Sequence, residues 1–201
     1  MLTGYQISSL VIDTLREQYY SQNIPVMFLY GDYQAQKDQS AVNMIGSLLK
    51  HIAHGAVGNI DEIRKSFEKS RQGGGNGLRL PEMLDLFVKT IGSLERVYIC
   101  VDAIDELLPQ HRSEFLRALQ QIVQEAPNVR LFLTGRSHIR GELDRNLTRG
   151  AYTIRIVPDQ GDITRYVNRK MEEADDRDPG LMTENLKNDV MKIMQEKASE
   201  M

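Results

Sequence analysis

Three acidic side chains follow an uninterrupted apolar run near the middle of the chain. Asp102 ends the apolar run 97–101, and Asp105 and Glu106 come three and four residues later. A short apolar run is typical of a strand buried on both faces, and parallel sheets bind ligands beyond the carboxyl ends of their strands. Because crowded carboxylates repel one another, the pattern predicts a hard cation such as Mg²⁺, itself carrying a phosphate. An acidic residue at a strand end also occurs for structural reasons alone.

A threonine and an arginine end a second apolar run further along the chain. The segment 129–134 predicts a strand that ends in Thr134, and Arg136 lies just past its tip. The planar guanidinium of arginine binds two phosphate oxygens at once. Arg136 is therefore a candidate for recognising a phosphate group bound beside Asp102. The alternative is an arginine that forms a salt bridge at the surface.

The elements that must position these residues alternate between helix and strand. Apolar spacings of three and four residues predict helices, and short apolar runs predict strands. The predicted helices are 7–21, 39–54, 59–70, 80–93, 111–124, 139–146, 162–173 and 183–199, and the predicted strands are 25–30, 96–101, 129–134 and 152–157. No hairpin signal joins neighbouring strands. The pattern therefore predicts an α/β fold of three layers with a mainly parallel sheet.

Composition excludes several kinds of partner and location. The 201 residues carry a net charge of −3, which gives no electrostatic reason to bind nucleic acid or an anionic membrane. No apolar run approaches the roughly 20 residues that span a bilayer. The single cysteine, Cys100, excludes an internal disulfide. We therefore expect no nucleic acid partner, no membrane partner and a reducing, cytoplasmic location.

Four segments together resemble NACHT-type P-loop NTPase domains, in particular the nephrocystin-like NACHT domains of fungal STAND proteins with ankyrin repeats. They are SSLVIDTLRE at 8–17, the run at 26–52, VYICVDAIDEL at 97–107 and VRLFLTGRSHI at 129–139. A small residue after the first aspartate, followed by an acidic pair, is fairly specific to NACHT domains. The resemblance implies a P-loop NTPase-like domain of the ASCE class over 1–175, with the Walker B segment at 97–106 and the sensor 1 strand at 130–136. Residues 176–201 would form a linker and the start of a following helical segment.

The resemblance also implies a role for each candidate site residue. Asp102 would hold Mg²⁺ through water, and Asp105 and Glu106 would be the catalytic pair that orients or activates the attacking water. Thr134 and Arg136 would contact the nucleotide, with Arg136 sensing the γ-phosphate. The implied cofactors are Mg²⁺ with ATP or GTP, and the implied function is a signal-transducing switch whose nucleotide state controls opening and oligomerisation.

One part of the family pattern does not occur in the sequence. A P-loop requires G-x-x-x-x-G-K-[ST], and no Gly-Lys pair occurs among the 201 residues. The strand before that loop would lie beside the strand 130–134. We therefore expect an N-terminally truncated NACHT domain that binds or hydrolyses ATP poorly by itself. Its partners would be the missing N-terminal and C-terminal regions of a larger protein, or a second copy through self-association.

Two other functions remain open at this point. The chain could be a non-catalytic interaction or scaffold module that retains the NACHT fold. It could also have a different α/β fold, such as a phospho-receiver or a haloacid-dehalogenase-like hydrolase with Asp102 as nucleophile. That last class needs acidic or lysine positions at other strand ends, and Asp32 and Lys89 are poor candidates for them.

Overall fold

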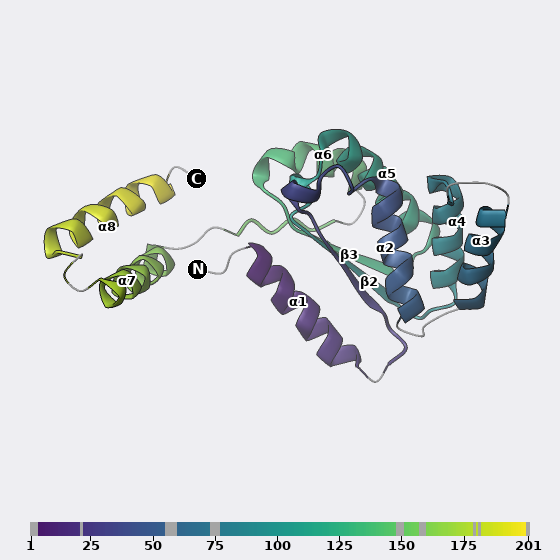
Figure 1. Cartoon of the computed structure of the whole chain (residues 1–201), viewed down its shortest axis with the longest axis horizontal. Helices are drawn as coiled ribbons and strands as arrows, with labels where there is room; N and C mark the ends of the chain where they lie inside the picture. Colours follow the sequence, from purple (N-terminus) through teal and green to yellow (C-terminus); the bar gives the residue numbers. More distant parts are fainter. Residues whose placement is uncertain are drawn as a thin grey trace. The chain divides into compact units, whose positions relative to one another are not determined.

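The computed structural model describes residues 4–20, 22–54, 60–72, 77–147, 151–156, 160–178, 180 and 182–199. Its helices and strands are α1 (Gly4–Tyr19), β1 (Val26–Tyr30), α2 (Ala41–His54), α3 (Ile60–Gln72), α4 (Leu80–Gly92), β2 (Val97–Asp102), α5 (Pro109–Glu125), β3 (Val129–Leu133), α6 (Arg140–Leu147), α7 (Gln160–Arg177) and α8 (Glu184–Ser199) (Figure 1). Three short 3₁₀ helices, η1 (Tyr33–Ala35), η2 (Ile104–Glu106) and η3 (Ser137–Ile139), lie in the connections. Most of the glycine run 73–77 lies outside the described residues.

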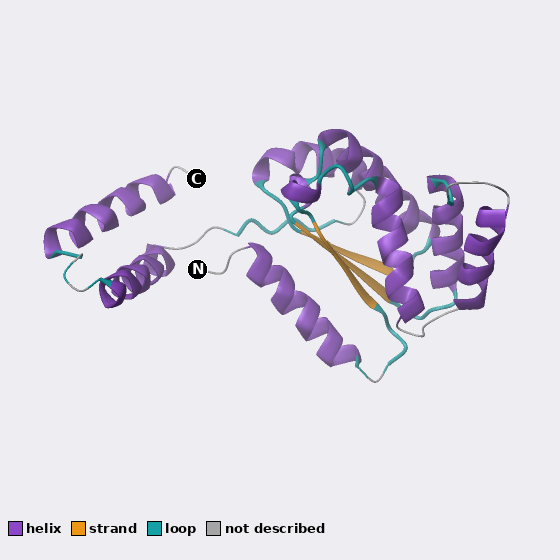
Figure 2. Cartoon of the chain, in the orientation of Figure 1, coloured by secondary structure: helices purple, strands orange, loops and turns teal. Residues whose placement is uncertain are grey.

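The described strands form one parallel sheet in the order β1-β2-β3, with helices around it (Figure 2). Tyr30 is the register partner of Asp102, and Val101 is the partner of Leu133. The carboxyl ends of all three strands therefore meet at one edge of the sheet. The prediction of an α/β fold with a mainly parallel sheet is confirmed.

Alternate residues of β2 face different helices. Val97, Ile99 and Val101 are fully buried in the main core, which they share with residues of α2, α4 and α5. The other face is turned toward α1, where Tyr98 stacks on Tyr19 at a ring-centroid distance of 5.3 Å. A strand buried on both faces explains why the run 97–101 is continuously apolar.

Local sequence signals explain where two helices begin. Pro81 lies in the first turn of α4, and the backbone N–H of Arg79 donates to the Glu82 carboxylate at 2.9 Å as part of a capping box. Pro109 likewise lies in the first turn of α5. Because α5 begins soon after β2, the residues of its first turns lie close to the end of that strand.

The predicted strand 152–157 is wrong for the residues that the structure describes. Residues 151–156 have no strand structure, and the side chains of Tyr152, Ile154 and Ile156 are 97%, 82% and 62% exposed. Val157 lies outside the described residues. Apolar residues at every second position favour a strand, but a strand also requires a neighbour to pair with. Among the described residues, β3 pairs with β2 alone, and 152–156 pairs with no strand.

The contacts divide the chain into two compact units, Leu2–Ala151 and Tyr152–Met201. This division lies upstream of the boundary at residue 175 that the family resemblance implies, and α7 crosses that boundary. In the second unit, Ile163, Val167 and Met171 of α7 form a small core with side chains that include Val190 and Met191 of α8. None of the described helices has the length and apolarity needed to cross a bilayer.

Candidate functional site

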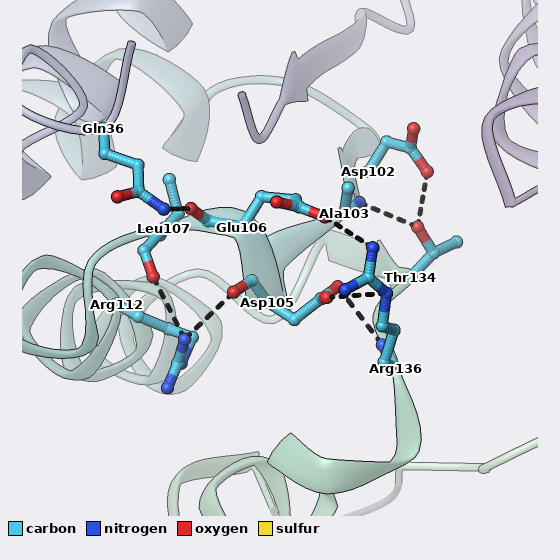
Figure 3. Close-up of polar contacts among 9 residues, drawn as sticks. All are labelled: Gln36, Asp102, Ala103, Asp105, Glu106, Leu107, Arg112, Thr134 and Arg136. Carbon is cyan, nitrogen blue, oxygen red and sulfur yellow. Dashed lines mark hydrogen bonds and ion pairs between the residues drawn. The ribbon is translucent and has the colours of Figure 1, made fainter. Parts of the chain in front are cut away.

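Asp102 lies at the end of β2 with only 4% of its surface exposed. Its carboxylate oxygen Oδ1 accepts a hydrogen bond from the hydroxyl of Ser8 in α1. The same oxygen accepts a second hydrogen bond, at 2.5 Å, from the hydroxyl of Thr134 beyond β3 (Figure 3). The Thr134 hydroxyl also accepts the backbone N–H of Ala103 at 3.0 Å. Two hydroxyl donors on one oxygen stabilise a buried carboxylate without a counter-charge. Ser8 was not predicted. The signal that could have found it is its place four residues before the buried Ile12, because residues at this spacing lie on the same face of a helix.

Arg136 is bound to the other two predicted carboxylates. Its Nη2 donates to Glu106 Oε1 at 2.9 Å, its Nε lies 3.6 Å from Asp105 Oδ2, and its backbone N–H donates to Asp105 Oδ1 at 3.2 Å. The Asp105 side chain is 4% exposed, whereas that of Arg136 is 73% exposed. The structure therefore brings Asp102, Asp105, Glu106, Thr134 and Arg136 to the same edge of the sheet (Figure 3).

The three carboxylates do not converge on a common point. No group of three or more His, Cys, Asp or Glu residues in the described part of the chain is arranged to hold a metal ion. The expected repulsion is relieved by the hydroxyls at Asp102 and by Arg136 at Asp105 and Glu106. Asp102 Oδ2 makes no hydrogen bond to the residues described, and the indirect, water-mediated hold on a cation that the family resemblance implies for Asp102 stays a prediction.

Residues 103–107, here called the acidic loop, have a conformation that depends on a left-handed residue. Ala103 has φ 51° and ψ 46°, and Ile104, which follows it, is completely buried. A left-handed backbone costs an L-residue with a side chain roughly 1–2 kcal/mol, and the cost is larger for branched side chains. The small residue after Asp102 is therefore explained by backbone geometry.

Two side chains, one from α5 and one from the turn after η1, hold three consecutive carbonyl groups of the acidic loop. Arg112 Nη1, in α5, donates to the carbonyl oxygens of Asp105 at 3.2 Å and Leu107 at 3.0 Å. Gln36 Nε2 donates to the carbonyl oxygen of Glu106 at 2.6 Å. Neither residue was predicted, because hydrogen bonds from a side chain to the backbone of a loop leave no periodic signal in a sequence.

The buried Arg112 is paired with Glu142 of α6. Arg112 Nε donates to Glu142 Oε2 at 2.8 Å, and the hydroxyl of Ser113 donates to Glu142 Oε1 at 2.7 Å. Burial by itself raises the pKa of Glu142, but the hydrogen bonds from Ser113 and Arg112 and the nearby arginine charges outweigh it and lower the pKa. Glu142 is therefore held in its charged form opposite the Arg112 guanidinium.

The left-handed turn gives a first testable prediction. Ala103→Gly should raise the free energy of unfolding by about 0.5–1 kcal/mol, because the relief of the left-handed strain exceeds the entropy that glycine adds to the unfolded chain. Urea unfolding followed by circular dichroism measures this change. Ala118→Gly in the interior of α5 is the control and should lower stability by about 1–2 kcal/mol, because it loses helix propensity and a buried methyl group. A loss of stability in both variants would contradict the role of the turn.

Comparison with known proteins gives one match. The family model described as "Nephrocystin 3, N-terminal" matches residues 6–136, which include most of α1, the sheet and all five predicted site residues. No curated protein and no solved structure matches the chain significantly. The match ends at Arg136, so the second unit lies outside it.

Proposed function

Because the chain belongs to the nephrocystin 3 N-terminal family, we propose that its acidic strand edge is part of a NACHT-type switch controlled by a nucleotide. The observation that supports the proposal most is the meeting of five polar residues at the ends of two adjacent strands. Asp102 ends β2, the acidic loop follows it, and Thr134 and Arg136 follow β3. Ligands of parallel sheets bind beyond the carboxyl ends of the strands, which is where these residues lie.

In this proposal Asp102 and Arg136 have different physical tasks. Asp102, through its open Oδ2, holds the water shell of a Mg²⁺ ion. When bound, this ion would neutralise negative charge on the phosphate groups. Arg136 is the one described cation that contacts both Asp105 and Glu106. A phosphate would therefore compete with these carboxylates for the guanidinium of Arg136, and its binding would release them.

The affinity of these residues for ATP should be weak. Tight phosphate binding by this class of site requires backbone N–H groups and a lysine in one glycine-rich loop, and the sequence contains no Gly-Lys pair. The glycine run 73–77 does not replace that loop, since it follows a helix, α3, and has no lysine. A single arginine and an indirectly held cation are then the main attractive groups.

Titration of the isotope-labelled chain with MgATP, followed by NMR, tests this function. We expect binding with a dissociation constant of about a millimolar, equivalent to roughly 4 kcal/mol. The shifted resonances should be those of Asp102, the acidic loop, Thr134 and Arg136. Asp102→Asn should abolish the Mg²⁺ dependence of these shifts because it removes the charge while keeping the shape.

The matched control is Asp144→Asn, which removes one partner of the exposed Arg140–Asp144 ion pair. This variant should bind MgATP like the unmodified chain. Micromolar binding would contradict the expected weakness of the site. Saturable shifts that lie elsewhere, or a Mg²⁺ dependence that persists in Asp102→Asn, would contradict the assignment of the site.

A second function, as an interaction module, is favoured by one observation. Tyr152, Ile154 and Ile156 occupy every second position of a segment without secondary structure and are largely exposed. Exposed apolar side chains gathered on one segment are typical of surfaces that bind other proteins. A chain that shows no response to MgATP at the acidic edge would leave this function as the better account.

A further inference from the structure

We infer that Arg112 is a positioning residue for the acidic loop. Through its ion pair with Arg112, Glu142 makes α6 the element that controls the position of this loop. Neither residue belongs to the set of five that the sequence predicted. The relevance of this link to nucleotide control rests on the proposed function. The link itself depends only on contacts within the unit Leu2–Ala151.

The first step is that the acidic loop is held by its backbone. Within the loop, the Glu106 N–H donates to the Ala103 carbonyl at 2.9 Å, and the Leu107 N–H donates to the Ile104 carbonyl at 3.3 Å. These two bonds close only a single short turn. Arg112 binds the carbonyls of Asp105 and Leu107 on either side of Glu106, whose own carbonyl is bound by Gln36 (Figure 3). The place of Arg112 therefore helps to set where the two acidic side chains begin.

The second step is that Glu142 orients Arg112. The Arg112 and Glu142 side chains are only 11% and 16% exposed, so water compensates little of either charge. Glu142 binds the Nε of the guanidinium, which leaves Nη1 directed at the loop carbonyls. Ser113 holds the second oxygen of Glu142, so the carboxylate has a defined orientation as well as a charge.

The third step is that one short segment reaches the acidic loop twice. Arg136 binds the side chains of Asp105 and Glu106, and η3 and α6 follow it directly in sequence. Glu142 of α6 then binds Arg112, which holds the backbone of the same loop. A displacement of α6 therefore moves the backbone of the acidic loop, through Glu142 and Arg112. It also moves Arg136, which compensates the negative charge of the loop.

Amide hydrogen exchange of the whole 201-residue chain, measured by NMR without nucleotide, tests the inference. In Glu142→Ala, the amides of Glu106 and Leu107 should exchange about ten- to a hundredfold faster relative to the Ile99 amide in β2. This range corresponds to the loss of one hydrogen bond to a charged group. The Nε resonance of Arg136 should also shift, although Arg136 contacts neither Arg112 nor Glu142 in the described structure.

The variants Glu142→Gln and Ser113→Ala provide milder tests if Glu142→Ala does not fold. Both keep a partner for Arg112 and should give smaller effects of the same sign. Asp144→Asn on α6 is the matched control and should leave the exchange ratio unchanged. An unchanged ratio in the Glu142 variants, or an equal acceleration in Asp144→Asn, would overturn the inference. Faster loop exchange in a chain that shows no MgATP response would overturn only the proposed function.

Discussion

Gly31→Ala is expected to lower the free energy of unfolding by about 3 kcal/mol or more, which is the upper range for an overpacked site. Gly31 follows β1, and its N–H donates to the Asp102 carbonyl at 2.8 Å. A Cβ atom at this position would lie 2.1 Å from the carbonyl oxygen of Ala103 and 2.9 Å from its carbonyl carbon. These are backbone atoms, so no side chain can rotate away to make room.

The substitution must therefore separate the end of β1 from the start of the acidic loop. We expect the loss of stability in urea unfolding to be accompanied by a shifted Arg136 Nε resonance, because the loop carries its two ion-pair partners. Gly92→Ala is the matched control, since a Cβ there meets no atom within 4 Å. The control should change stability by less than about 1 kcal/mol. Stability of Gly31→Ala within that same range would show that the backbone contact is not as close as described.

Ile104→Ala should lower stability by about 2–5 kcal/mol, the usual cost of truncating a fully buried isoleucine. Ile104 has no exposed surface and lies in the acidic loop, between the left-handed Ala103 and Asp105. Its Cγ2 methyl lies beside Gly135, which precedes Arg136. The side chain therefore anchors the acidic loop in the core and also supports the segment after β3.

A graded series separates anchoring from a general loss of fold. Ile104→Val should cost only about 0.5–1.5 kcal/mol, since it removes one methyl group. Ile154→Ala, at an isoleucine that is 82% exposed, should stay within about 0.5 kcal/mol of the unmodified chain. Equal losses for Ile104→Ala and Ile154→Ala in urea unfolding would contradict the anchoring role of Ile104.

The position of the candidate site followed from short-range patterns. Strands predicted at 25–30, 96–101 and 129–134 are found at Val26–Tyr30, Val97–Asp102 and Val129–Leu133. Apolar runs and helical spacings are local properties, so they can be read along the chain. Once the sheet is parallel, the carboxyl ends of the strands must share an edge, and Asp102 and Thr134 then lie together.

The partners of the site residues could not be predicted in this way. Ser8, Gln36 and Glu142 each contact residues far away in sequence. Arg112 lies near the acidic loop in sequence, but no spacing rule relates it to the two loop carbonyls that it binds. The binding of Arg136 to Asp105 and Glu106, where a phosphate was expected, depends on the path that the chain takes after β3. The segment 152–157 failed as a strand for a related reason, because pairing requires a neighbour that its own residues do not specify.

Apart from the segment 152–157, the amino-acid sequence by itself determined the types of element, the direction of the strands and the edge at which the polar residues meet. Only the tertiary structure decided which cation faces each carboxylate and which donors hold the acidic loop. The physical reason is range: apolar runs and helical periodicity relate residues a few positions apart, whereas the side-chain hydrogen bonds and ion pairs of the site depend on distances between atoms that folding alone brings together.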